Sequence, residues 1–232
     1  TVTGVQTCAL PICYIHSSLA NFDVQRQGKK GVASTVSFDI GGLWEPKDLG
    51  PFEDRLSLGL NLSNLGPKLT YIQQSQADPL PTNLRLGIAA KLVKTEFNNI
   101  TAVIDFSRLL VRRYPADTTF TSSGASASVR DPYVDDLPKS LFSAWGDGGL
   151  RKVTIATGIE YWYGAPRLVA LRFGYFYEHP QYGNRKFLTF GAGIRYDIYA
   201  FDFSYLSAVE ENHPLGETLR FTLSIAWGAD EE

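Results

Sequence analysis

The segment Val153–Tyr163, which reads VTIATGIEYWY, decides the fold class of this chain. In a pleated strand successive side chains point to opposite faces, so its odd-numbered side chains share one face and its even-numbered ones the other. The same period of two recurs in most of the chain. Many strands about ten residues long, joined in sequence, are typical of a barrel that spans an outer membrane.

We expect nine strands, preceded by the tail of a further strand at residues 14–20. The nine cover residues 32–44, 55–64, 82–93, 99–110, 152–163, 168–178, 187–196, 199–207 and 218–227. The pattern therefore predicts an all-β protein, an antiparallel transmembrane β-barrel.

The two faces of these strands differ in charge. In the apolar register that we assign, the outward face carries residues such as Leu58, Leu86 and Phe201 and no charged residue. A Lys or Arg that faces lipid at mid-bilayer costs ~2–4 kcal/mol, which explains an uncharged outer face. The opposite face would form a polar network in the lumen from Asp39, Arg85, Lys91, Asp105, Glu160, Arg172, Arg195, Asp202 and Arg220.

A soluble β-sandwich would also give each strand one apolar face. Aromatic residues near the strand ends argue against it, because amphipathic rings favour bilayer interfaces. These residues are Trp44, Tyr161, Tyr163, Tyr177, Tyr196, Tyr199, Tyr205 and Trp227.

Connection lengths point the same way. Tight links near residues 164–166 and 197–198 alternate with long ones at 66–81, 114–151, 178–186 and 209–217. Outer-membrane barrels have short periplasmic turns and long external loops. Counting back from a periplasmic C-terminus places every one of these long connections outside.

Composition excludes some classes of protein. The formal net charge is -2, so no basic footprint for nucleic acid is present. No stretch approaches the ~18–20 apolar residues of a membrane helix. Barrels distribute their apolar residues on alternate positions, so this does not argue against a membrane.

The first residues are set aside. Residues 2–12 read VTGVQTCALPI and resemble a translated sequencing adapter, with Cys13 as a junction codon. A natural apolar N-terminus is the alternative. We expect an artefactual scar at 1–13, the C-terminal part of a barrel at 14–227 and a tail at 228–232.

No catalytic constellation is recognisable. His16, His179 and His213 are far apart in sequence and lack metal-ligand spacing. We therefore expect no enzyme activity, no metal and no cofactor. The charges of the lumen network would fill the interior as ion pairs, or would form a polar path or a docking site for a plug.

The long connection 114–151 is the best candidate for a functional loop, because loops above ~12–15 residues are usually functional or disordered. Residues 118–128 are rich in small polar residues and are expected to be mobile. Residues 135–145 begin with acids and a proline, which predicts a short helix. Its apolar stripe would fold back on the barrel mouth or bind a protein partner, and consists of Leu137, Leu141, Phe142 and Trp145.

Several motifs resemble one protein family. They are Glu160-Tyr161-Trp162-Tyr163 and the segments at 174–179, 183–186, 218–223, 58–66 and 81–87. Together they resemble the PorV family of the type IX secretion system, whose members are similar to FadL-like barrels. The resemblance covers most of the chain from residue 14.

The resemblance implies about nine or ten strands of a FadL-like barrel of about fourteen strands, hence an incomplete barrel. The signal peptide, plug region and first strands would precede it. Unpaired sheet edges cannot be satisfied in lipid, so we expect that this part alone would not insert as a stable barrel.

The resemblance also implies a function in protein transport at the bacterial outer membrane. Such a non-enzymatic shuttle would take cargo with C-terminal signal domains from a SprA-like translocon to the attachment complex with a PorU-like sortase. Its partners would be these proteins and membrane lipids. A FadL-type channel for hydrophobic small molecules and a structural or adhesive protein are the alternatives.

Overall fold

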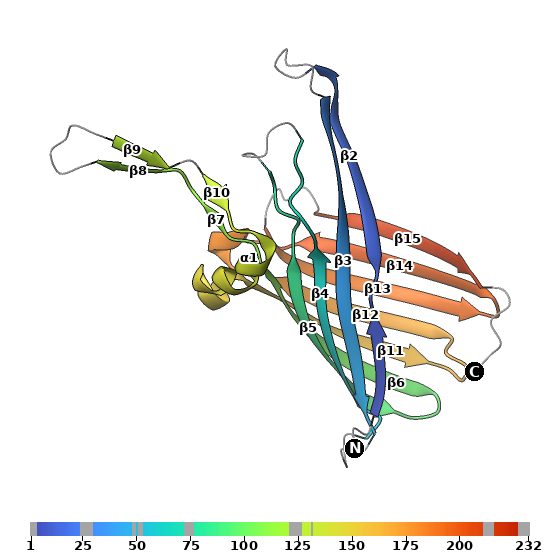
Figure 1. Ribbon diagram of the computed structural model, residues 1–232. Helices are drawn as coiled ribbons and strands as arrows, with labels where there is room; N and C mark the ends of the chain where they lie inside the picture. Colours follow the sequence, from blue (N-terminus) through green and yellow to red (C-terminus); the bar gives the residue numbers. More distant parts are fainter. Residues whose placement is uncertain are drawn as a thin grey trace.

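A large antiparallel sheet dominates the computed structural model, which describes residues 4–23, 30–47, 50, 53–71, 77–120, 127–130, 132–210 and 216–226 (Figure 1). The strands are β1 (Gly4–Ala9), β2 (Ile12–Asp23), β3 (Lys30–Pro46), β4 (Leu56–Leu65), β5 (Asn83–Lys94), β6 (Asn98–Leu109), β11 (Val153–Tyr163), β12 (Val169–Tyr177), β13 (Lys186–Tyr196), β14 (Tyr199–Ala208) and β15 (Thr218–Ile225). Their spatial order follows the sequence. All nine expected strands are present, with ends within three residues of the expected ones.

The first edge of the sheet is longer than the expected remnant at 14–20. β1 and β2 lie end to end along β3, with Ala9 opposite Gly41 and Ile12 opposite Phe38. The backbone of Pro11 bridges the break and accepts a 3.0 Å hydrogen bond from Asp39 N. The adapter-like residues thus belong to an edge strand, which pairs through its backbone whatever its side chains are.

The sheet curls into an incomplete barrel. Within the described residues, the β1–β2 edge pairs only with β3, and β15 pairs only with β14. In Figure 1 the early strands lie in front of the late ones, as expected for a strongly curved sheet. The all-β, antiparallel barrel architecture is therefore confirmed, and the barrel is not closed.

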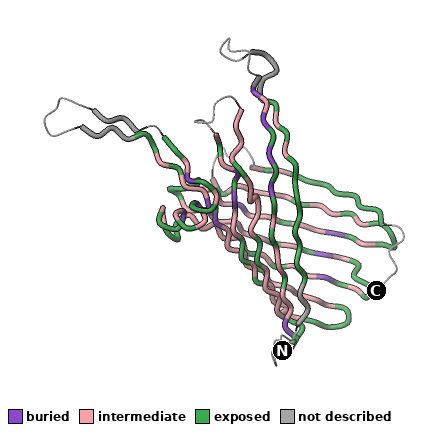
Figure 2. The backbone as a smooth tube through the Cα atoms, in the orientation of Figure 1, coloured by how far each residue is buried: buried purple, intermediate pink, exposed green. Residues whose placement is uncertain are grey.

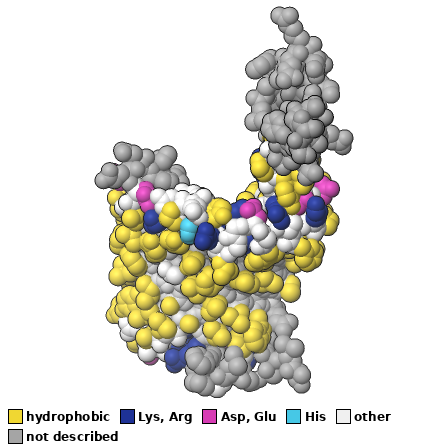
Figure 3. All heavy atoms as spheres, turned by 90° about the vertical axis from the view of Figure 1, so that its left-hand side faces the viewer, with side chains coloured by type: hydrophobic (Ala, Val, Ile, Leu, Met, Phe, Trp, Pro, Cys, Tyr) yellow, Lys and Arg dark blue, Asp and Glu magenta, His cyan; other side chains and the backbone are white. Residues whose placement is uncertain are grey.

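The strand register places the apolar residues together on the convex face. Leu60 lies opposite Leu86, and Phe201 lies opposite Leu223. These side chains are 45–67 % exposed, so no second layer of the described chain covers them. Figure 2 shows few buried positions along the strands, and Figure 3 shows one side of the molecule covered largely by apolar side chains.

Aromatic residues mark the two ends of this convex face. Tyr163 is 49 % exposed, and Tyr196 faces Tyr199 across the β13–β14 turn. Tyr177 lies at the other end of the strands, opposite Ile155. Tyr205 lies nearer the middle, opposite Phe190, and Trp227 falls outside the described residues.

The predicted alternation of connections is confirmed, because antiparallel pairing places the connections 66–82, 110–152, 178–185 and 209–217 at one end. We call this the loop end. The connection 110–152 contains β7 (Arg113–Tyr114), β8 (Asp117–Phe120), β9 (Ala127–Arg130) and β10 (Tyr133–Val134), then α1 (Leu137–Ser143) and the 3-10 turns η4 (Ala144–Gly146) and η5 (Gly149–Lys152). One further connection, 47–55, is as long as 209–217 but lies at the short-turn end, so the alternation is confirmed for the four connections named above and not for this one.

The helix predicted at 135–145 is confirmed as α1 and η4. Part of the segment expected to be mobile forms strands instead: β8 pairs with β9, and residues 121–126 lie outside the described part. In the described part of the chain, no helix has the length and apolarity needed to cross a membrane.

Candidate functional site

The connections at the loop end are tied to one another by side-chain contacts. Lys68, from the connection 66–82, forms a 2.8 Å ion pair with Asp136 and donates to Val134 O at 2.7 Å. Arg113 of β7 pairs with Asp78 at 2.6 Å. These contacts hold the 66–82 connection against the 110–152 connection, so the two form one assembly.

Asp135 organises the base of the 110–152 connection. It is 4 % exposed and accepts hydrogen bonds from Tyr114 Oη at 3.2 Å and Ser143 Oγ at 2.6 Å. Lys139 completes the cluster with a 2.8 Å ion pair. Burial alone would raise the pKa of Asp135, but these donors outweigh it and leave the pKa below its ordinary value.

An arm leaves the sheet above this cluster. The short hairpin β7–β10 starts the arm, with the rings of Tyr114 and Tyr133 stacked at 4.4 Å, and the hairpin β8–β9 continues it. In Figure 1 the arm extends away from the barrel. An element that extends so far from the sheet is suited to contact with another macromolecule.

Arg108 fastens residues 137–152, which we call the helical cap. It lies on the convex side, opposite Leu84 and Val153, and is only 2 % exposed. Its guanidinium donates to the backbone oxygens of three cap residues and stacks over the Trp145 ring at 4.6 Å; the acceptors are Ala144, Asp147 and Gly149.

This position corrects one sequence expectation. The outward face was expected to carry no charge, whereas Arg108 is an outward charge at the loop end of β6. The cap carbonyls replace water at the two terminal nitrogens of the guanidinium, whereas its buried Nε has no hydrogen-bond partner among the described residues.

The expected apolar stripe does not form a single surface. Leu137 and Leu141 are half-buried, and Leu137 lines a pocket with Phe38 and Leu65, so this part folds back on the barrel. Phe142 and Trp145 are 80 % and 46 % exposed. Leu150, which the sequence analysis did not single out, is 83 % exposed and lies just beyond the predicted helix. It could have been noticed as an apolar residue that follows two glycines and precedes two basic residues.

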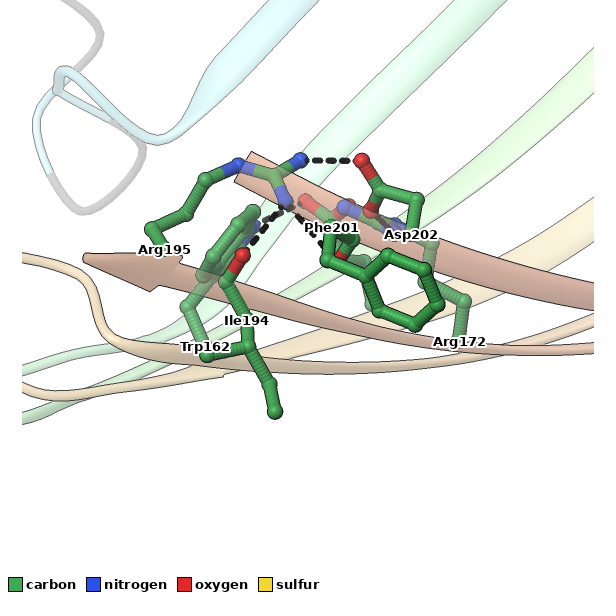
Figure 4. A network of polar contacts seen from close by, with 7 residues as sticks. Trp162, Arg172, Ile194, Arg195, Phe201 and Asp202 are labelled. Carbon is green, nitrogen blue, oxygen red and sulfur yellow. Dashed lines mark hydrogen bonds and ion pairs between the residues drawn. The ribbon is translucent and has the colours of Figure 1, made fainter. Parts of the chain in front are cut away.

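The lumen network that the sequence predicted is partly assembled on the concave face of β11–β14. Arg172 donates to Glu160 at 2.6 Å and to Asp202 at 2.8 Å, and Arg195 donates to Asp202 at 2.7 Å (Figure 4). Trp162, absent from the prediction, donates to Glu160 at 2.6 Å and lies beneath both guanidinium groups. Two positive and two negative charges thus neutralise one another.

The other predicted lumen residues share the concave face but not this network. Asp39 accepts a 2.8 Å hydrogen bond from Asn64 N. Arg85 and Asp105 line a cavity of about 500 Å³ together with the ion pair of Glu178 and Arg185. The side chains of four predicted residues form no hydrogen bond or ion pair with any other described residue: Arg85, Lys91, Asp105 and Arg220.

The two described histidines, His16 and His179, have separate hydrogen-bond partners. His16 bonds to Ser34 Oγ at 2.8 Å, and His179 accepts from Gln181 N at 3.2 Å. His213 lies outside the described residues. The described residues contain no group of three or more His, Cys, Asp or Glu side chains arranged to hold a metal ion.

Comparison with models of protein families gives a match. The family model described as "Type IX secretion system protein PorV" matches residues 4–116, which comprise β1–β6 and the start of the arm. The motif segments at 58–66 and 81–87 lie within the match, and those from 160 onward lie outside it. No curated protein matches the chain significantly.

Proposed function

Because the chain belongs to the PorV family of type IX secretion system proteins, we propose that it acts as a shuttle at the bacterial outer membrane. It would take cargo with C-terminal signal domains from a SprA-like translocon to the attachment complex with a PorU-like sortase. The observation that carries the proposal is the tied assembly of connections at one end of the sheet, with an arm that extends from it.

The convex face supports an outer-membrane location. Large apolar side chains such as Leu60, Phe201 and Leu223 are about half exposed or more and form a continuous surface. Aromatic residues stand at both ends of the strands, where a bilayer interface would lie. A water-soluble protein rarely exposes an apolar surface of this extent unless the surface binds a partner.

The assembly at the loop end supports contact with protein partners. The arm is anchored by the Tyr114–Tyr133 stack and by the Arg113–Asp78 ion pair, so its base has a defined direction. A pre-positioned loop loses less conformational entropy on binding than a free one. A carrier that must bind and release successive cargoes benefits from such an arrangement.

A photocrosslinking experiment tests this function. Benzoylphenylalanine replaces Tyr133, whose ring is 38 % exposed, in cells with a type IX system. Glu96, in the turn between β5 and β6 at the opposite end, is the matched control. We expect position 133 to crosslink to a very large barrel or to cargo signal domains, and position 96 to neither. Crosslinks from neither position to these proteins would refute the shuttle role.

The described lumen gives no specific support to a FadL-type channel. The cavity on the concave face is lined by Arg85, Asp105, Lys152, Glu178 and Arg185. An apolar ligand there would remove water from these charges without replacing its hydrogen bonds. Fatty acid that co-purifies with the protein, without secretion partners, would favour the channel instead.

A further inference from the structure

The helical cap is fastened at the convex rim of the sheet, and its last residue, Lys152, lines the cavity on the concave face. Its anchor, Arg108, is on the convex side, and the anchored backbone oxygens belong to η4, η5 and the turn between them. Ala144 is 2 % exposed, so the cap makes close contact there. The rest of the cap therefore projects from the same side as the apolar face.

The height of the cap can be read from the strand register. Arg108 pairs with Val153, and the next outward pair along these strands is Phe106 with Ile155. Ile155 also faces Tyr177, which marks the aromatic end of the convex face. Two residues along a strand span roughly 7 Å, so the cap begins about 7 Å beyond that aromatic level.

The cap exposes apolar side chains at this height. Phe142 is 80 % exposed and Leu150 is 83 % exposed, while Trp145 is 46 % exposed with one ring face under Arg108. Such side chains in water would be unfavourable, and Trp is the residue that favours the headgroup region.

We propose that the helical cap is a membrane-contact element, whose Phe142, Trp145 and Leu150 side chains enter the headgroup region of the outer leaflet. The cap continues the apolar convex face at the height of the interface, so lipid that covers the strands covers it too. The arm and the connection 66–82 then remain for protein partners.

This inference rests on the proposed outer-membrane location, so its test measures both separately. Single cysteines at Phe142 and Leu150 are labelled with bimane in a C8S/C13S background. Because the chain alone is not expected to insert, the labelled chain is tested as part of the complete barrel that the family resemblance implies, in phosphatidylcholine bilayers. Phe221 on β15 is the lipid control and is 67 % exposed. Gln181, in the exposed turn after β12, is the water control. Headgroup-region nitroxide lipids and aqueous iodide are the two quenchers.

We expect labels at 142 and 150 to be quenched by nitroxide lipid at least about fivefold more than the label at 181, and to be shielded from iodide. Strong iodide quenching at 142 and 150, with lipid quenching intact at 221, would overturn the inference and leave the membrane location standing. Shielding from both quenchers would also overturn it, since it would mean contact with protein. Absence of lipid quenching at 221 would overturn the location as well.

Discussion

Replacement of Arg108 by methionine should release the helical cap from the sheet. The arginine donates to Ala144 O at 2.6 Å, to Asp147 O at 3.1 Å and to Gly149 O, and its guanidinium lies 4.6 Å from the Trp145 ring centre. Methionine has a similar length and suits an outward position, so the strand itself should persist. The substitution therefore removes only the interactions that join the strand to the cap.

The magnitude follows from these hydrogen bonds. A hydrogen bond to a charged group contributes about 1.5–3 kcal/mol, and the low end applies because carbonyls at a rim can rehydrate. Three such bonds give about 4.5 kcal/mol, from which about 1 kcal/mol is subtracted because removing an arginine near an interface is itself favourable. A net loss of about 3.5 kcal/mol increases the opening of the cap roughly 400-fold.

Amide hydrogen exchange in detergent micelles measures this opening. The reporters are the amides of Ser140, Asp147 and Arg151, which donate to the backbone oxygens of Asp136, Ala144 and Gly148 respectively. Arg220→Met is the matched control, because Arg220 is exposed on β15. Arg108→Lys, which retains the charge but not the fork, should give an intermediate effect. A change below about threefold in Arg108→Met would refute the role of this arginine.

Three other changes should have measurable effects. The pKa of Asp135 lies below its ordinary 3.8, so the unfolded state binds the proton more tightly than the folded state. Protection of the α1 amides from exchange should therefore be constant above about pH 4 and fall below that pH. Asp135→Asn should remove this pH dependence. Gly193→Ala would put a methyl carbon 2.5 Å from a carboxylate oxygen of the lumen network and should lower the unfolding free energy in urea by about 1–3 kcal/mol, whereas Gly42→Ala, with open space around it, should change it by less than about 0.5 kcal/mol. Glu178→Gln breaks the two-pronged pairing with Arg185, so trypsin should cleave after Arg185 about tenfold faster; an unchanged rate would mean that the turn is held by other contacts.

The strands could be located from the sequence because their constraint is local. Each one must keep a period of two to hold its apolar side chains on one face, and turn residues end the pattern. The short helix was also visible, since acids and a proline precede its apolar residues. These features need no knowledge of distant segments.

The pairing of the lumen charges could not be read in the same way. Arg172 reaches Glu160 on one neighbouring strand and Asp202 two strands away, across the narrow space left by Gly191 and Gly193. Such reach depends on the register of four strands. The sequence could predict the face of each charge but not its partner.

The hairpins of the arm and the role of Arg108 were missed for a related reason. The rings of Tyr114 and Tyr133 stack although β8 and β9 separate these residues in sequence, so no periodic sequence pattern predicts their pairing. Arg108 breaks the outward pattern because a loop more than thirty residues later covers it. A pattern read from each strand alone cannot predict that a distant loop buries one of its side chains.

The cap is held mainly through main-chain oxygens, which every amino acid provides. Arg108 and Arg112 grip the carbonyls of Ala144, Asp147, Gly149 and Ser143, and Lys68 does the same for Val134. Cap side chains that make none of the anchoring contacts, such as Phe142 and Leu150, could therefore be replaced in related proteins without weakening the attachment. Related proteins could therefore differ in the exposed side chains of the cap while the hydrogen bonds to its backbone oxygens remain the same.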